Sequence, residues 1–106
     1  MKRYEIRWTD LDPTRGDEIA KTRPAVIVSL DVLNRSLATV VVCPLTSQLR
    51  PSWRSRVQVR CEGRPADVAV DQIRAVSKSR IGDRIGKLSA DEAATLRRVL
   101  TEMYGE

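Results

Sequence analysis

The sequence predicts a small, mainly β (α+β) domain, in which a strongly curved antiparallel barrel packs against one C-terminal helix. Two observations lead to this fold class. Short apolar or alternating runs, separated by turn residues, occupy most of the chain, and apolar residues recur at helical spacing only near its end. A chain of 106 residues is one domain, 1–106, that is long enough to bury a modest core.

The first predicted element is a half-buried strand over residues 4–9, where apolar Tyr4, Ile6 and Trp8 alternate with polar side chains. The strand stops before Pro13. We expect no membrane span and no secretory signal, because charged residues interrupt every apolar residue at the N-terminus. A cytoplasmic location is therefore the default expectation.

Residues 13–22 are polar, include Gly16 and show no sustained period, which predicts a long mobile loop between the first two strands. Long loops in compact domains are often functional. This loop carries Arg15 and leads directly to Arg23, so we expect it to act as a lid over whatever Arg23 binds.

The run 23–29 (Arg-Pro-Ala-Val-Ile-Val-Ser) predicts a core strand covered on both faces, with Arg23 at its start. Residues 31–36 indicate a helical turn capped by Asp31. A second apolar run, 39–45, contains Pro44, which should mark an edge, a bulge or the end of regular pairing.

Polar residues follow the second apolar run at Thr46 and Ser47, whereas Arg23 opens the first. If the two runs pair as antiparallel strands, these ends meet. A guanidinium held at a strand end is suited to bind a phosphate or carboxylate, because it offers five donors in a planar fork. The alternative is an ordinary surface ion pair or an arginine that packs its stem on the surface.

Residues 47–55 form a second polar loop, in which Trp53 lies among arginines. Two interpretations stay open: Trp53 stacks on a base while the cations follow phosphates, or it caps the core or a subunit interface. Residues 56–61 alternate cleanly, with the arginines outward. A turn over 62–65 and a strand from Val68 through Arg74 follow, and short broken segments come after that.

The C-terminal helix has the clearest local signal. Ser89 and Glu92 have the spacing of a capping box, and Gly105 supplies a stop. Its charged side chains, Arg97 among them, are expected on a solvated face. The apolar stripe that should pack on the sheet is Ala93, Leu96, Leu100 and Met103.

The chain has a formal net charge of +5, which favours a polyanionic partner, although a solvated basic face is the alternative. The excess is concentrated in one stretch, where a single acid, Glu62, stands among Arg50, Arg54, Arg56, Arg60 and Arg64. Cys43 and Cys61 are far apart and no histidine occurs, so neither a zinc site nor any other metal or cofactor is expected. Both thiols are expected to be buried and free.

Blocks of residues spread in order from Trp8 to Arg80 resemble the MazF/PemK-like toxins of type II toxin-antitoxin systems. They are Trp8-x-x-Leu11-Asp12-Pro13-x-x-Gly16, Arg23-Pro24-Ala25-Val26-Ile27-Val28-Ser29, Asn34-Arg35, Val42-x-Pro44-Leu45-Thr46-Ser47 and Val70-Asp71-Gln72-Ile73-Arg74-x-Val76-x-Lys78-x-Arg80. The resemblance implies a CcdB-like, SH3-like barrel that forms a homodimer. It also implies a metal-independent, sequence-specific endoribonuclease acting on single-stranded RNA, and a cognate antitoxin that covers the substrate groove.

The resemblance implies that Arg23 and Thr46 are the catalytic residues. The residues expected to contact RNA are Lys21, Ser47, Gln48, Arg50, Asp71 and Gln72. Whether Asp71 is a general base or purely structural stays open. The sequence also departs from the family: Asp17 and Ala69 replace a histidine and an arginine of one member, and Tyr4 replaces a glycine, so the backbone there is open to change.

RNA carries its own nucleophile, the 2′-OH, so an enzyme needs chiefly to align that oxygen and stabilise the developing charge. We expect Arg23 to clamp the phosphate and Thr46 to hydrogen bond to it or to the 2′-OH. The expected products are a 2′,3′-cyclic phosphate and a 5′-OH. The alternatives are a non-nucleolytic toxin of the same fold that inhibits DNA gyrase, and an inactive nucleic-acid-binding module.

Overall fold

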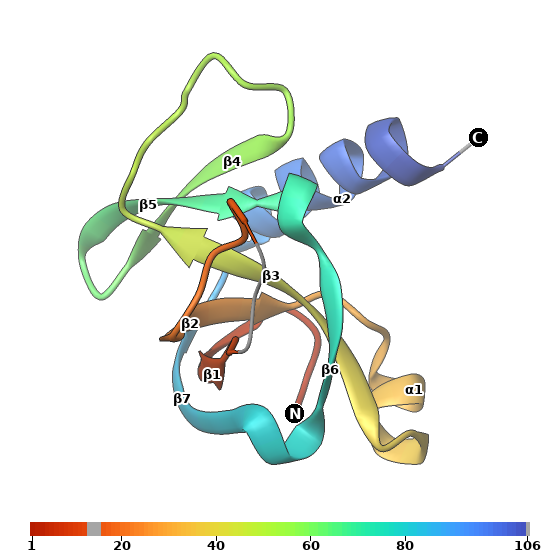
Figure 1. Cartoon of the computed structure of the whole chain (residues 1–106). Helices are drawn as coiled ribbons and strands as arrows, with labels where there is room; N and C mark the ends of the chain where they lie inside the picture. The colour runs from red at the N-terminus through yellow and green to blue at the C-terminus, as the bar shows by residue number, and fades with distance from the viewer. Residues whose placement is uncertain (13–15, 106) are drawn as a thin grey trace.

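The computed structural model describes residues 1–12 and 16–105, and these form a curled antiparallel sheet with one long helix against it (Figure 1). The strands are Glu5–Asp10 (β1), Thr22–Ile27 (β2), Thr39–Thr46 (β3), Arg56–Cys61 (β4), Arg64–Ala69 (β5), Arg74–Ser77 (β6) and Ile81–Lys87 (β7). The helices are Asp31–Ser36 (α1) and Ala90–Tyr104 (α2), and Val70–Gln72 (η1) and Lys78–Arg80 (η2) are 3₁₀ turns. The predicted mainly β fold class is confirmed.

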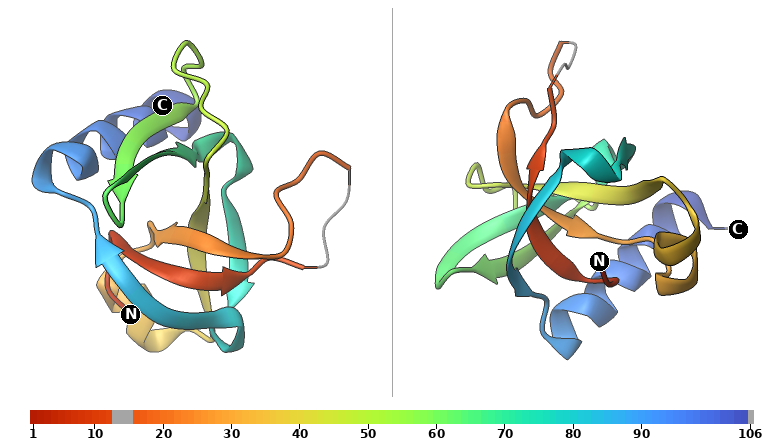
Figure 2. Two further views of the ribbon diagram at one scale, coloured as in Figure 1. Left: turned by 90° about the vertical axis from the view of Figure 1, so that its left-hand side faces the viewer. Right: turned by 90° about the horizontal axis from the view of Figure 1, so that it is seen from below.

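Strand β3 is the centre of the sheet, whose order is β4-β5-β3-β2-β1-β7 with β6 also paired to β3. Residues 39–42 pair with β6, whereas Leu45 and Thr46 pair with β5. Pro44 lies between these two sets and is itself aligned with Ala25 of β2. Near Pro44, one edge of β3 changes its partner from β6 to β5, as the predicted end of regular pairing implies. On the other edge, the pairing with β2 includes Pro44. This change of neighbour accompanies the curl of the sheet into a half-barrel (Figure 2).

Strand β2 is covered on both faces, as its unbroken apolar run predicted. Val26 and Val28 lie in the larger core cluster, together with Leu96 of α2. Ala25 and Ile27 point to the opposite face and belong to a second buried cluster. Each of these four side chains is no more than 6% exposed, so the run from Ala25 to Val28, the residue after β2, has no solvent face. A strand buried in this way is a rigid support for its terminal residues.

Strand β1 does not follow the predicted alternation to its end. Ile6 is buried, but Trp8 is 41% exposed and Thr9 is 1% exposed, the reverse of what the pattern predicted. The pairing of β1 with β7 shifts register between Ile6 and Arg7 and again between Arg7 and Thr9. An irregularity of this kind re-aims the side chains that follow it, so the local sequence pattern was misleading here.

Helix α1 is not capped by Asp31, contrary to the prediction. Its N-cap is Leu30, which makes no side-chain cap, and Asp31 Oδ1 instead accepts the backbone N–H of Arg3 at 2.7 Å. A buried Asn34 secures the helix: its Nδ2 donates to the carbonyl of Ser29, and the Ser29 hydroxyl donates back to its Oδ1. The helix is therefore held by a local amide contact to Ser29 and not by a side-chain cap.

Helix α2 begins as predicted. Ser89 Oγ accepts the N–H of Glu92, and the Glu92 carboxylate accepts the N–H of Ser89, which completes the capping box. Gly105 ends the helix. Among the described residues no helix, α2 included, is long and apolar enough to cross a membrane. The α2 side chains that pack on the sheet are Ala93, Leu96 and Val99, with Leu100 and Met103 partly buried.

The predicted strand from Val68 through Arg74 is interrupted. Strand β5 ends at Ala69, and η1 follows, closed by the N–H of Ile73 donating to the carbonyl of Val70. The Val70 N–H donates to Ser55, at the end of the second loop. The chain turns sharply at η1 as a result, and β6 leaves in a new direction along β3 (Figure 1).

Tyr4 lies just before β1 with φ at 72°, in the left-handed region that favours glycine. Its N–H donates to the Ile27 carbonyl at 2.6 Å, and its carbonyl accepts the N–H of Leu88 at 3.0 Å. Its ring packs against the core and lies 4.8 Å from the Arg3 guanidinium carbon. Tyrosine thus occupies a conformation suited to glycine because long-range backbone bonds hold it there.

The hairpin between β4 and β5 has two central residues in the left-handed region, Glu62 with φ at 53° and Gly63 with φ at 76°. Such turns favour asparagine or glycine at the first position. We expect Glu62→Asn to raise the free energy of unfolding by about 0.5–1 kcal/mol, because glutamate strains this position. Urea denaturation measures this gain. The matched change Glu62→Ala should give none, and equal values for the two variants would contradict the expectation.

Candidate functional site

The pairing of β2 with β3 brings together the two strand ends that the sequence marked. Ala25 is aligned with Pro44 in antiparallel register, so Arg23 and Thr46, each two residues further out, lie at the same level of the sheet. Both line one hollow of about 490 Å³, the Arg23 hollow. The expected meeting of these ends is confirmed. The Arg23 hollow is lined by Trp8, Arg23, Pro24, Leu45, Thr46, Ser47, Cys61, Glu62, Arg64, Pro65 and Ala66.

Arg23 and Thr46 are each held by a local hydrogen bond. Arg23 Nε donates to the Ala20 carbonyl at 2.9 Å, which fixes one edge of the planar guanidinium. Thr46 Oγ1 accepts the N–H of Gln48 at 3.1 Å. Both residues are half-buried. The Arg23 guanidinium and the Thr46 hydroxyl therefore stand on neighbouring rigid strands, where both can contact the same group of a bound ligand.

Thr46 also lines a second hollow of about 480 Å³, the Trp53 hollow, so it stands between the two. This hollow is formed by Asp17, Ile19, Thr46, Gln48, Arg50, Trp53, Arg56, Asp71 and Gln72. The structure thus divides the predicted RNA contacts between the hollows. Ser47 lies in the Arg23 hollow, and the Trp53 hollow contains Gln48, Arg50, Asp71 and Gln72. Lys21 is exposed and lines neither.

Trp53 does not cap the core, because it is 47% exposed. Two arginines lie close to its ring: the guanidinium carbon of Arg56 is 4.8 Å from the ring centroid, and that of Arg50 is 5.5 Å away. Arg54, between them in the sequence, points elsewhere and pairs with Glu102 of α2 at 3.3 Å. The arginine cluster of the sequence is therefore divided between the hollow and the outer surface.

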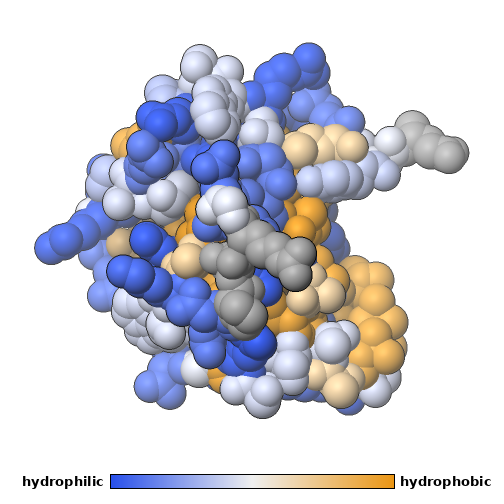
Figure 3. Space-filling model, in the orientation of Figure 1, coloured by the Kyte–Doolittle hydropathy of each residue, from blue (hydrophilic) through white to orange (hydrophobic). Residues whose placement is uncertain are grey.

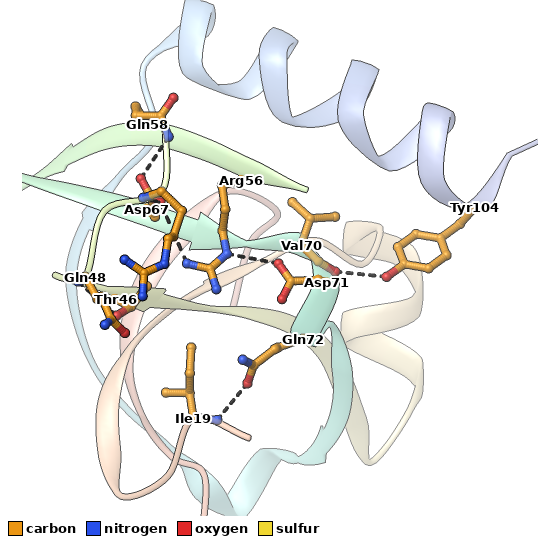
Figure 4. Close-up of polar contacts among 11 residues, drawn as sticks. Ile19, Thr46, Gln48, Arg56, Gln58, Asp67, Val70, Asp71, Gln72 and Tyr104 are labelled. Atoms are coloured by element: carbon orange, nitrogen blue, oxygen red, sulfur yellow. Dashed lines mark hydrogen bonds and ion pairs between the residues drawn. The ribbon is translucent and has the colours of Figure 1, made fainter. Parts of the chain in front are cut away.

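The sequence prediction was most clearly wrong about Arg56, which it placed on the outer face of its strand. Its side chain is 8% exposed, and its Nε donates to Asp71 Oδ1 at 3.0 Å (Figure 4). Its Nη1 lies 3.7 Å from Oδ2 of Asp67, whose side chain is fully buried. Sequence reasoning missed Asp67 entirely. The available signal was an acid inside the otherwise apolar run 66–70.

The loop before β2 is joined to η1. Gln72 Oε1 accepts the backbone N–H of Ile19 at 2.6 Å, and Tyr104 of α2 donates to the carbonyl of Val70 at 2.9 Å (Figure 4). Burial raises the pKa of Tyr104. Arg15, part of the predicted lid, lies outside the described residues, whereas the segment 16–21 stands beside the barrel (Figure 2).

The cysteines are free, as predicted. Cys43 is buried, and burial raises the pKa of its thiol to about 12. Cys61 is only half-buried, in the Arg23 hollow, so the prediction that both thiols are buried was wrong for this one; burial raises its pKa as well. The described residues contain no group of three or more histidine, cysteine or acidic side chains arranged to hold a metal ion.

The half-barrel with its C-terminal helix has the fold of solved structures. It superposes on MazF (Form-I) from Deinococcus radiodurans with a TM-score of 0.86 and 24% identity, covering 100% of this chain and 97% of that one. A structure titled endoribonuclease in complex with its cognate antitoxin, from Mycobacterial species, gives a TM-score of 0.82 at 24% identity, over 99% and 95% of the two chains. These likenesses establish the fold.

Residues 2–104 match the family described as PemK-like, MazF-like toxin of type II toxin-antitoxin system. Endoribonuclease MazF9 of Mycobacterium tuberculosis (strain ATCC 25618 / H37Rv) is 34% identical, over 94% of this chain and 92% of the relative. Endoribonuclease EndoA of Bacillus subtilis (strain 168) is 28% identical, over 83% and 80%. The chain belongs to the PemK-like, MazF-like toxin family.

Proposed function

We propose that this protein is a toxin that cuts single-stranded RNA as a sequence-specific, metal-independent endoribonuclease. The observation that carries the proposal is the placement of Arg23 and Thr46 at adjacent strand ends in one hollow. Relatives named endoribonuclease, such as MazF9, support the reaction class. Independence from metal ions rests on the donor set, since the chain has no histidine and its described residues form no acidic or thiol cluster suited to a metal.

The mechanism uses the nucleophile that RNA supplies. The 2′-OH attacks the adjacent phosphorus and releases its proton to water. The bond from phosphorus to the 5′ oxygen breaks as that oxygen takes up a proton from water, which leaves a 2′,3′-cyclic phosphate and a 5′-OH. Arg23 stabilises the charge that develops on the phosphate oxygens, because its positively charged guanidinium donates several hydrogen bonds. Thr46 hydrogen bonds to the phosphate or the 2′-OH and aligns them. The backbone of both residues is set by the sheet, so little reorganisation is needed.

The substrate strand crosses Thr46 from one hollow to the other. Ser47 contacts it in the Arg23 hollow, and the Trp53 hollow receives a neighbouring nucleotide. In the latter, the exposed Trp53 ring offers a stacking surface and Arg50 a cation beside it. Lys21 lies near the start of β2, where it attracts the backbone at longer range. The side chains in the Trp53 hollow that can read base edges are Gln48 and Gln72.

Asp71 has a structural role in this proposal, and the general base is not assigned to it. Its Oδ1 accepts Arg56 Nε at 3.0 Å, so its carboxylate is committed to an ion pair. The oxygen that accepts Arg56 Nε is not free to take a proton from the 2′-OH. The short distance between Asp71 and Arg56 therefore favours the structural interpretation over the catalytic one.

We also propose that two copies of the chain associate through α1, and that a cognate antitoxin covers the hollows in the cytoplasm. Exposed apolar side chains gather on and beside α1: Leu30 is 50% exposed, Val32 55%, Leu33 45% and Leu37 49%. They form an apolar patch on the face drawn in Figure 3, at the position of α1 in Figure 1. Contiguous patches of this kind mark association surfaces.

The reaction class is tested with a matched pair of oligonucleotides in the presence of a chelator. An RNA strand should be cut to a 2′,3′-cyclic phosphate and a 5′-OH, and the same strand with 2′-deoxyribose at the cut site should stay intact, because the nucleophile is missing. Electrophoresis and end-group analysis give the result. Cutting of the deoxy strand would refute the mechanism. Intact RNA together with inhibited gyrase supercoiling would favour the non-nucleolytic toxin, and binding without scission would favour an inactive module.

Replacing Arg23 by alanine should lower kcat by about a hundredfold or more, because one preorganised donor to the developing charge is lost. Thr46→Ala should lower it less, since a neutral hydroxyl contributes a weaker hydrogen bond. Circular dichroism is expected to show an unchanged fold. Arg98→Ala on the exposed face of α2 is the control for loss of one positive charge, and it should cut at the normal rate. Equal kcat for Arg23→Ala and Arg98→Ala would exclude Arg23 from catalysis.

The association surface is tested by Leu33→Glu. A charge in the α1 patch should convert dimers to monomers, because a carboxylate buried at an apolar interface is left unpaired. Size-exclusion chromatography with light scattering measures the mass. Leu49→Glu is the matched control, since Leu49 is 39% exposed in the second loop, away from α1. The surface is wrongly assigned if Leu33→Glu stays dimeric, or if both variants dissociate equally.

A further inference from the structure

We propose that Asp67 and Arg56 are positioning residues: together they hold the loop of residues 47–55 against the barrel, and thereby determine which RNA sequences are bound and cut. The inference rests on the proposed endoribonuclease function and assigns part of its specificity. Neither side chain is more than 8% exposed. The proposed mechanism assigns neither of them a contact with the scissile phosphate. The role of this pair is to place residues that do meet RNA.

Asp67 anchors the backbone of the loop. Its side chain is fully buried on β5, yet it accepts two hydrogen bonds and makes one ion-pair contact. Oδ2 accepts the backbone N–H of Arg50 at 2.7 Å and lies 3.7 Å from the Arg56 guanidinium, and Oδ1 accepts Gln58 Nε2 at 2.9 Å (Figure 4). A buried carboxylate is costly unless such donors surround it. The loop must therefore keep Arg50 in place for the carboxylate to remain satisfied.

The loop is built outward from that anchor. Arg50, whose N–H binds Asp67, accepts the N–H of Trp53 on its carbonyl at 3.0 Å. Trp53 in turn accepts the N–H of Arg56 on its own carbonyl at 3.3 Å. Two consecutive turns thus connect the buried carboxylate to the start of β4, with Trp53 at their junction. The position of the indole ring follows from the position of Asp67.

Arg56 fixes the other side of the hollow. Its guanidinium binds Asp71 of η1 through Nε, approaches Asp67 through Nη1, and lies 4.8 Å from the centroid of the Trp53 ring. A planar fork can meet all three partners at once, and the ammonium of lysine cannot. Gln72, next to Asp71, accepts the backbone N–H of Ile19. Arg56 is therefore connected, through Asp71 and η1, to the loop before β2.

Stability alone does not account for this pair. A buried ion pair is often no more stable than well-packed apolar side chains of similar volume. Asp67 is 0% exposed, so an apolar residue at this position would be shielded from water. What an apolar residue cannot do is accept the Arg50 N–H. The polar pair therefore contributes geometry, at the wall of the Trp53 hollow.

The reacting residues do not depend on the pair in the same way. Arg23 and Thr46 are brought level by the pairing of β2 with β3. Thr46 is also the backbone partner of Asp67 in the pairing of β3 with β5, but no described side-chain hydrogen bond joins Arg23 or Thr46 to Arg56 or Asp67. Moving the loop should consequently weaken substrate binding and sequence preference while leaving the chemical step largely intact. That separation between KM and kcat is the signature of positioning.

The test compares Arg56→Gln and Asp67→Asn with Arg54→Gln. Arg54 lies at the end of the loop, two residues before Arg56, carries the same charge as Arg56 and has a side chain that is 86% exposed, so it is a matched control for Arg56. We expect Arg56→Gln and Asp67→Asn to raise KM about tenfold, to keep kcat within about threefold, and to spread cutting over more sites in total RNA. Arg54→Gln should keep the KM and the cut-site pattern of the unchanged protein. An unchanged KM and pattern in Arg56→Gln, or a collapse of kcat at constant KM, overturns the inference.

The double variant Arg56→Met/Asp67→Leu distinguishes misfolding from loss of loop positioning. It removes both charges and is expected to fold, because apolar side chains can replace a buried pair. It should still show the raised KM; a normal KM in this folded variant overturns the inference. Failure of the proposed function has a different signature, no cutting by the unchanged protein. In that case acrylamide quenching of Trp53 fluorescence, measured in a Trp8→Phe background, tests the positioning of the loop directly. Quenching should increase in Arg56→Gln and not in Arg54→Gln. Equal quenching in the two variants overturns the inference.

Discussion

The register between β2 and β3 is the constraint on which the rest of the structure depends. Ala25, Val26 and Ile27 pair with three consecutive residues of β3, and β2 is buried on both faces. A slip by one residue would exchange the side chains that face the two core clusters, which differ in volume, so the packing selects one alignment. The same alignment sets Arg23 level with Thr46. The candidate site is thus a direct consequence of core packing.

A second, weaker constraint acts on the loops. Two hollows meet at Thr46, and the walls of the Trp53 hollow include the segments 16–21 and 47–55, which are mostly polar. Such segments are ordered by hydrogen bonds and not by burial. Here the bonds converge on two buried or nearly buried charged groups, Asp67 and Arg56, which makes the walls depend on a few polar contacts. The part of the molecule that is proposed to bind RNA is therefore also the part that contains these buried charged groups.

The arginines of the middle segment illustrate how charge is distributed in three dimensions. Arg50 lies by the Trp53 ring, Arg54 pairs with Glu102 on the outside, and Arg56 is buried between two carboxylates. Only part of the positive charge counted in the sequence is therefore available to a polyanion. Net charge indicates the kind of partner, but the number of cations that meet it is decided by side-chain placement.

The sequence by itself determined the fold class, the two core strands and the capping box of α2, because these depend on short-range patterns or on the burial of continuous apolar runs. It marked Arg23 and Thr46 at the ends of two strands, and the pairing of β2 with β3 brought those ends together. Tertiary structure decided the exposure of Trp8, the burial of Arg56 and the partners of Asp67. These features depend on register shifts and on contacts between strands distant in the chain. No local pattern encodes such contacts, because a side chain's partner is chosen only when the sheet closes.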